Sequence, residues 1–259
     1  MLKIFGVSIS DLGLRGAVEQ IIELTKHAGR HLVVTANPEI LVYARRHADY
    51  HQVLAQATLI VPDGTGVVMA SYVLGRPIKQ GRVTGVELVS ELAKKSESQG
   101  YSLYFFGADN AVLQNAIMAL KNKYGNINVI GYGIIPFFND IVNINEAENS
   151  KILANISQKR PDILLVGIGH PKQEYWINKY ISQLPVKVAI GVGGTFDYLS
   201  GVVKMPPMMF KKFGLEWLWR LIIQPKRFHR IFTAVFVFSF YVIYNSLVRH
   251  PGSTSRIQK

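Results

Sequence analysis

An aspartate followed by glycines, Asp63 in Val61-Pro62-Asp63-Gly64-Thr65-Gly66, is the first residue whose type and position could do chemistry. It comes directly after an apolar run, and its carboxylate could act as a general base toward a hydroxyl group. The glycines let a ligand approach the backbone closely. Alternatively, Asp63 caps the following helix by accepting a hydrogen bond from a backbone N–H. The residues themselves leave both roles open.

Neutral polar side chains end another apolar run, at Thr35-Ala36-Asn37-Pro38-Glu39. The Thr35 hydroxyl and the Asn37 amide could hydrogen-bond sugar hydroxyls or an acetamido group. Pro38 is typical of the first turn of a helix that Asn37 would cap, so capping is the alternative role of Asn37.

Phosphate groups could be bound at two other places in the sequence. The first is Gly167-Ile168-Gly169-His170-Pro171-Lys172-Gln173-Glu174, which lacks the full G-x-G-x-x-G spacing of a dinucleotide site. A G-x-G turn before a helix could still receive a phosphate, with Gln173 as a polar neighbour. Arg82 precedes another predicted helix and could also meet a phosphate. The alternatives are a solvated Gln173 and a surface Arg82.

The sequence contains few residue patterns that could bind a metal ion. There is no cysteine and no pair of aspartates two residues apart, and His47 and His51 have no evident third ligand. We therefore expect no metal and no other cofactor. The charge of an anionic ligand would then be balanced by arginines, and Arg220, Arg227 and Arg230 are available. Their alternative partner is anionic lipid.

Six short apolar runs end where most of these candidates lie, and segments with helical spacing separate most of the runs. Such runs suit strands buried on both faces, and their alternation with helices predicts an α/β fold with a Rossmann-like, mostly parallel sheet flanked by helices. Ligands of such sheets bind beyond the carboxyl ends of the strands. The runs are His31–Asn37, Ala57–Gly64, Tyr101–Gly107, Ile127–Gly133, Asp162–Gly169 and Val186–Gly194.

The last fifth of the chain differs in composition. Residues 204–259 hold ten of the 29 Lys and Arg residues but one of the 17 acids, Glu216, in a chain of net charge +12. We expect an α/β catalytic domain over 1–203 and a basic, apolar helical appendage over 204–259. Ile231 to Val248 carries no charge. It could span a membrane, lie on its surface beside anionic lipid, or be buried against another copy of the chain.

Other partners and places are less compatible with the sequence. The aromatic residues near the basic cluster lie in an apolar run rather than interleaved as stacking platforms, so we expect no nucleic-acid partner. The N-terminal residues lack the apolar region of a signal peptide, so we expect the catalytic domain to stay on the cytoplasmic side.

Taken together, six motifs resemble the TagA/WecG/CpsF family of bacterial glycosyltransferases. Their order and spacing extend over residues 1 to about 230. The motifs are Thr35-Ala36-Asn37-Pro38-Glu39, Pro62-Asp63-Gly64-Thr65-Gly66, Arg82-Val83-Thr84-Gly85, Pro171-Lys172-Gln173-Glu174, Gly191-Val192-Gly193-Gly194-Thr195-Phe196-Asp197 and Gly214-Leu215-Glu216-Trp217-Leu218-Trp219-Arg220.

The resemblance implies an inverting, metal-independent transfer of a hexose from a UDP-sugar to an undecaprenyl-diphosphate-linked sugar at the cytoplasmic membrane face. N-acetylmannosamine is the leading expectation for the hexose, and the products would feed teichoic acid, capsule or exopolysaccharide synthesis. Asp63 would be the general base. Pocket residues would be Thr35, Asn37, Arg82 and Gln173, joined by Arg220, Arg227 and Arg230 from the appendage.

Two departures from the family pattern bear on the donor. Met205-Pro206-Pro207 stands where many relatives have Arg-Ala-Pro, and Glu87 stands where many have Asp. The rival interpretation is a membrane-tethered nucleotide-binding or scaffold protein without catalysis. It would need the basic appendage but not Asp63, so UDP binding without turnover would favour it.

Overall fold

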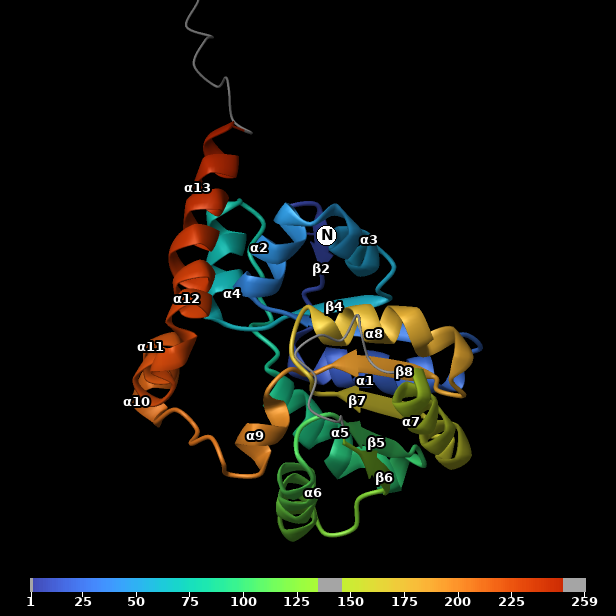
Figure 1. Cartoon of the computed structure of the whole chain (residues 1–259). Helices are drawn as coiled ribbons and strands as arrows, with labels where there is room; N and C mark the ends of the chain where they lie inside the picture. Colours follow the sequence, from blue (N-terminus) through green and yellow to red (C-terminus); the bar gives the residue numbers. More distant parts are fainter. Residues whose placement is uncertain (1, 135–145, 249–259) are drawn as a thin grey trace, which may run out of the picture.

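A six-stranded parallel sheet forms the centre of the computed structural model, which describes residues 2–134 and 146–248 (Figure 1). The spatial order is β4-β3-β8-β7-β5-β6, and all neighbouring strands are parallel. Each strand falls within one of the six predicted runs, so the α/β prediction is confirmed. The strands are β3 (His31–Ala36), β4 (Leu59–Pro62), β5 (Leu103–Phe106), β6 (Val129–Gly133), β7 (Ile163–Val166) and β8 (Val188–Gly191).

Helices cover both faces of this sheet and create two apolar cores. Successive residues of a strand point to opposite faces, so Val34 belongs to one core and Val33 to the other. One core includes residues of α2 (Pro38–Arg46), α3 (Ala48–Ala55), α4 (Thr65–Val73), α7 (Glu146–Lys159) and α8 (Lys172–Tyr180). The other includes residues of α1 (Gly13–Lys26), α5 (Gly85–Gln99), α6 (Asn110–Tyr124) and α9 (Thr195–Leu199).

Local capping chemistry sets where two helices of the site begin. The Asn37 side chain accepts a hydrogen bond from Ile40 N at 3.0 Å, and Pro38 occupies the first turn of α2. The Thr84 hydroxyl accepts one from Glu87 N at 3.3 Å and also bonds the Glu87 carboxylate at 2.7 Å, which starts α5.

A short antiparallel hairpin, β1 (Leu2–Ile4) and β2 (Val7–Ile9), precedes the sheet and was not predicted. Its apolar side chains join the same core as α2 and α3. A short helical turn, η2 (Ile181–Gln183), follows α8.

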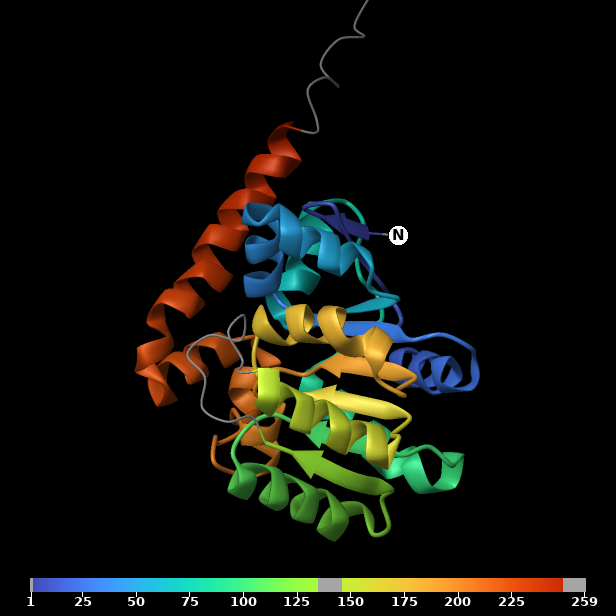
Figure 2. The same cartoon turned by 45° about the vertical axis from the view of Figure 1, so that its right-hand side comes forward.

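The C-terminal segment forms a chain of helices along one side of the body, in red and orange in Figures 1 and 2. Within the described residues, one helix is long and apolar enough to cross a membrane, Pro225–Val248, with a mean hydropathy of 1.9. Arg249 and the rest of the predicted appendage, 249–259, lie outside the described residues. The elements are α10 (Met208–Lys212), α11 (Glu216–Ile223), η3 (Pro225–Arg227), α12 (Phe228–Phe232), the π-helical turn η4 (Thr233–Val237) and α13 (Phe238–Val248).

This last helix is docked on the body along one of its sides. Phe238 and Val242 are buried, and Phe5 of the hairpin turn makes an edge contact with Phe238 at a ring distance of 5.7 Å. The Arg45 guanidinium of α2 lies 4.5 Å from the Tyr241 ring. Ser246 donates a hydrogen bond to the carbonyl of Val73 in α4 at 3.4 Å.

Candidate functional site

Asp63 lies directly after β4, at the edge of the sheet toward which the strand arrowheads in Figures 1 and 2 point. Its backbone N–H donates to the Ala36 carbonyl at 2.8 Å, which fixes it beside the end of β3. Gly64, with a φ of +90°, is the residue that caps α4, and no side chain caps that helix. The structure therefore does not support the capping role for Asp63.

The electrostatic surroundings of Asp63 keep its carboxylate basic. Burial raises its pKa to about 6, although the Arg220 and Arg82 guanidinium groups act in the opposite direction. No side chain of residues 2–134 and 146–248 hydrogen-bonds this carboxylate. This carboxylate is ionised at neutral pH, lies near two cations and accepts no side-chain hydrogen bond among these residues. It is therefore suited to accept a proton.

Arg82 is close to Asp63 but is already engaged. Both of its terminal nitrogens contact the two carboxylate oxygens of Glu216, the first residue of α11. One of them also donates to the Thr65 hydroxyl at 3.2 Å. Arg82 thus joins the α/β body to the C-terminal segment.

Thr35 and Asn37 lie at the end of β3, and the structure gives both of them internal hydrogen bonds. The buried Thr35 hydroxyl donates to the Gly191 carbonyl at 2.9 Å. The Asn37 side-chain oxygen caps α2, as its alternative role predicted, which leaves its NH₂ group for a ligand.

Gln173 is buried between two strand ends. Its NH₂ group donates to Glu174 at 2.7 Å, and its oxygen accepts from Gly193 N at 2.9 Å. A side chain at Gly191 would come within 2.7 Å of the Gln173 amide nitrogen, so this glycine permits the close approach. Gln173 is therefore not the solvated helix residue of the alternative, and it shapes the glycine-rich loop before α9.

Arg220 and Arg227 bring positive charge to the same edge of the sheet. The Arg220 guanidinium lies 5.6 Å from the Tyr198 ring, and its buried Nε has no hydrogen-bond partner among residues 2–134 and 146–248. Burial lowers the pKa of Arg227, and repulsion from Arg220 and Arg230 lowers it further. Within the described residues, neither arginine has a carboxylate oxygen within 4.0 Å.

Arg230 is paired instead with Glu39, in the first turn of α2, through contacts of 2.6 and 3.2 Å. His170 Nε2 lies 3.1 Å from the same carboxylate. Burial would raise the pKa of Glu39, but its contacts with His170 and Arg230 outweigh burial and lower it to about 2. Glu39 is thus ionised at any neutral or mildly acidic pH.

Two carboxylates, Glu39 and Glu216, are functional candidates that the sequence analysis missed. The available signals were that Glu39 ends the motif holding Thr35 and that Glu216 is the single acid of the predicted appendage. The structure brings Asp63, Arg82 and Arg220 together and places Arg230 on Glu39.

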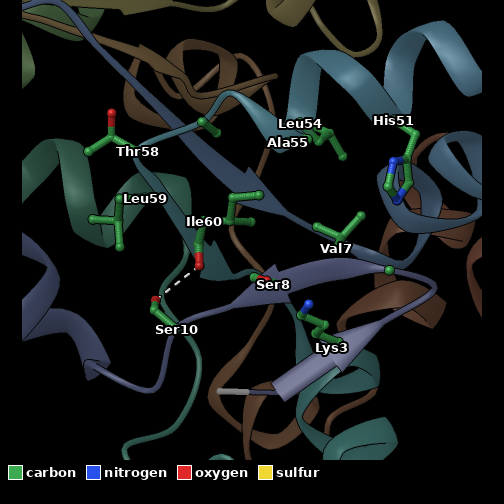
Figure 3. A pocket seen from close by; sticks show the side chains of 12 residues that line it. Lys3, Val7, Ser8, Ser10, His51, Leu54, Ala55, Thr58, Leu59 and Ile60 are labelled. Atoms are coloured by element: carbon green, nitrogen blue, oxygen red, sulfur yellow. Dashed lines mark hydrogen bonds between the residues drawn. The ribbon is translucent and has the colours of Figure 1, made fainter.

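A cavity of about 340 Å³ lies elsewhere, between the β1–β2 hairpin, α3 and β4 (Figure 3). Lys3, Ser10 and His51 are among its lining residues, and Ser10 donates to the Ile60 carbonyl at 2.9 Å. None of the candidate site residues lines this cavity, so it is separate from the site at Asp63.

Comparison with known proteins agrees with the motif pattern. Residues 2–251 match the model of the glycosyl transferase WecG/TagA/CpsF family. A protein of Bacillus spizizenii named N-acetylglucosaminyldiphosphoundecaprenol N-acetyl-beta-D-mannosaminyltransferase is 36% identical over 77% of this chain and 74% of its own length. A protein of the same name from Staphylococcus aureus is 35% identical over 89% of this chain and 87% of its own.

Proposed function

Because this chain belongs to the WecG/TagA/CpsF glycosyltransferase family, we propose that it transfers a hexose from a UDP-sugar to an undecaprenyl-diphosphate-linked sugar, with inversion and without a metal. The names of the relatives favour N-acetylmannosamine as the hexose and N-acetylglucosamine as the acceptor sugar. The observation that carries the proposal is the unengaged Asp63 carboxylate beside two arginines, at the edge of a parallel sheet where ligands bind.

In the proposed reaction, Asp63 accepts the proton of the acceptor hydroxyl while the hydroxyl oxygen attacks the anomeric carbon. The bond from that carbon to the diphosphate oxygen breaks, and UDP leaves with the bonding electrons. A base with a pKa of about 6 is ionised at pH 7 and still basic enough to receive the proton as it is released.

Arg220 and Arg227 are the residues best placed to take the diphosphate. Neither has a carboxylate oxygen within 4.0 Å among the described residues, and burial and the neighbouring cations destabilise the charge of Arg227 more than Asp197 stabilises it. An anion between them would relieve that repulsion and would be stabilised as its charge grows during transfer. The roles of Arg220 and Arg227 predicted from the family pattern are retained in this proposal.

The C-terminal helices are proposed to rest on the cytoplasmic face of the membrane, where the lipid-linked acceptor would be. Exposed apolar side chains continue along them, and α4, which packs beside α13, adds Met69, Tyr72 and Val73. We call these residues the apolar face. In the C-terminal segment they are Met208, Met209, Phe213, Ile222, Phe228, Phe232, Phe236, Phe240, Ile243, Tyr244, Leu247 and Val248.

Basic residues accompany this face, with Lys211 and Lys212 in α10 and Lys226 in η3. Apolar area with nearby lysines suits insertion among anionic lipids. Since Phe238 and Val242 hold α13 against the body, the helix would lie along the surface rather than cross the bilayer.

The deciding experiment is UDP release by full-length protein in detergent, with a panel of UDP-sugars and a short-chain polyprenyl-diphosphate-N-acetylglucosamine acceptor. The proposal expects release with one donor, dependent on acceptor, insensitive to EDTA and lost in Asp63→Asn. UDP binding without release on any donor and acceptor would favour the non-catalytic scaffold instead.

A further inference from the structure

Two ion pairs of opposite polarity join the C-terminal helices to the α/β body. In one, the body supplies the cation, Arg82, and α11 supplies the anion, Glu216. In the other, the body supplies the anion, Glu39 of α2, and α12 supplies the cation, Arg230. Glu216, the single acid of residues 204–259, therefore takes part in one of these two ion pairs.

Both pairs have features that exposed surface pairs lack. The side chains of Arg82 and Glu216 are each 23% exposed, and Glu39 is 16% exposed although its partner Arg230 is 44% exposed. Each pair uses both carboxylate oxygens and two guanidinium nitrogens, which fixes orientation as well as distance. Exposed pairs such as Arg15–Glu19 contribute little by comparison.

Each pair is also tied to a loop that carries a site residue. Glu39 stands two residues after Asn37 and reaches His170, three residues before Gln173. Glu216 lies 3.3 Å from the hydroxyl of Thr65, two residues after Asp63. The contacts therefore set the C-terminal helices against the loops that hold the proposed base and pocket.

The four arginines consequently divide into two groups. Arg82 and Arg230 contact carboxylates directly, whereas Arg220 and Arg227 have no carboxylate oxygen within 4.0 Å among the described residues, although Asp197 is near enough to attract both. An arginine whose guanidinium N–H groups already donate to a carboxylate is a poorer ligand for a phosphate than one whose N–H groups have no carboxylate acceptor.

We propose that Glu39 and Glu216 are positioning residues that clamp the C-terminal helices over Asp63, and that Arg82 and Arg230 act as their partners rather than as diphosphate ligands. The clamp keeps Arg220 and Arg227 facing the reacting groups. Its effect on turnover rests on the proposed function, but the clamp itself is a statement about geometry and can be tested without turnover.

The test uses charge reversal and its reciprocal rescue in the full-length chain. The variants are Glu39→Arg, Arg230→Glu and the double exchange, with Glu216→Arg, Arg82→Glu and their double exchange as a second set. Glu39→Gln and Glu216→Gln remove the charge with little change of shape, in case a reversal does not fold. Glu19→Arg, at the exposed Arg15–Glu19 pair, is the matched control.

The first readout is the rate of trypsin cleavage after Lys204, identified by fragment mass. The Lys204–Met205 bond is exposed, but the Lys204 carbonyl accepts a hydrogen bond from the Trp219 indole of α11 at 3.1 Å. Release of the helices therefore frees this segment to take up the extended conformation that the protease cleaves. We expect each single reversal to speed cleavage about tenfold, which corresponds to about 1.4 kcal/mol of clamp energy. The double exchanges should return to within about threefold of the unmodified chain, and the control should not change.

The second readout is UDP affinity measured by calorimetry. The clamp predicts weaker UDP binding in Arg230→Glu and recovery in the Glu39→Arg/Arg230→Glu double exchange. A double exchange as weak as Arg230→Glu alone would identify Arg230 as a ligand of the diphosphate and overturn the proposal. Unchanged cleavage in all single variants would also overturn it, whereas a chain that cleaves as expected but transfers no sugar would count against the proposed function only.

Discussion

The ionisation of Asp63 links the proposed chemistry to pH. Burial raises its pKa to about 6, and only the ionised form can accept a proton. We therefore predict that kcat/KM is constant above neutrality and falls about tenfold per pH unit below about pH 6. Steady-state rates from pH 4.5 to 8 would show this limb. A rate that stays constant down to pH 4.5 would contradict the assignment of Asp63 as the base.

The same burial makes Asp63 costly for stability. Its pKa is raised above the unfolded value, so the native state disfavours the charged form, and the penalty is fully present above pH 6 and vanishes below about pH 4. Since one pKa unit corresponds to about 1.4 kcal/mol, we predict that Asp63→Asn stabilises the fold by up to about 3 kcal/mol at pH 7.5. Urea unfolding of both chains at pH 7.5 and pH 4 would measure this gain, and a loss of stability at pH 7.5 would refute it.

At the scale of elements, Thr35 shows how a strand end is held. Its hydroxyl hydrogen-bonds the Gly191 carbonyl and so extends the pairing of β3 with β8 by one contact. Thr35→Val keeps the shape but removes this buried hydrogen bond, and we predict a loss of about 0.5–1.5 kcal/mol in the free energy of unfolding. Thr35→Ser, which keeps the hydroxyl, is the control. Lost activity with unchanged stability in the valine variant would instead favour direct contact with substrate.

The elements themselves were largely readable from the sequence, because strands buried on both faces leave continuous apolar runs that end in Gly, Asn or Asp. Strand order was not readable, since the pairing of β3 with β8 joins residues far apart in the chain. The β1–β2 hairpin escaped prediction because two strands of three residues carry too little periodicity.

The site divides in the same way. Asp63 and Gln173 could be singled out from residue type and position after an apolar run, and Arg82 from its position before a predicted helix. The pairing of Arg82 with Glu216 spans 134 residues, and no local spacing predicts it. For the same reason, the sequence could not separate Arg230, which is paired with Glu39, from Arg220 and Arg227, which form no ion pair within 4.0 Å in the described part of the chain.

At the scale of the whole molecule, neighbouring residues of one helix are predicted to behave oppositely. Phe240 is 64% exposed and belongs to the apolar face, whereas Phe238 is 2% exposed and packs on Phe5. We predict that Phe240→Asp reduces sedimentation with anionic phospholipid vesicles and leaves the melting temperature unchanged. Phe238→Asp should lower the melting temperature by several degrees, since it buries an unpaired charge.

Electrostatic attraction should show in the same vesicle assay. Binding of the unmodified chain is expected to weaken when salt rises from about 0.05 to 0.5 M, because added ions screen the lysines from the lipid. Equal vesicle binding of Phe240→Asp and the unmodified chain would contradict the proposed orientation.

The order of the site residues along the chain has a consequence for biosynthesis. Asp63, Thr35 and Gln173 precede residue 204, whereas Arg220 and Arg227 follow it. A nascent polypeptide on the ribosome thus completes its six-stranded sheet before it has made the cations proposed to receive the diphosphate. Until α11 and α12 emerge, such a chain would have the proposed base but not the arginines proposed to bind the diphosphate of a nucleotide sugar. Donor consumption would therefore begin only after the C-terminal helices, which are proposed to rest on the membrane, have been translated.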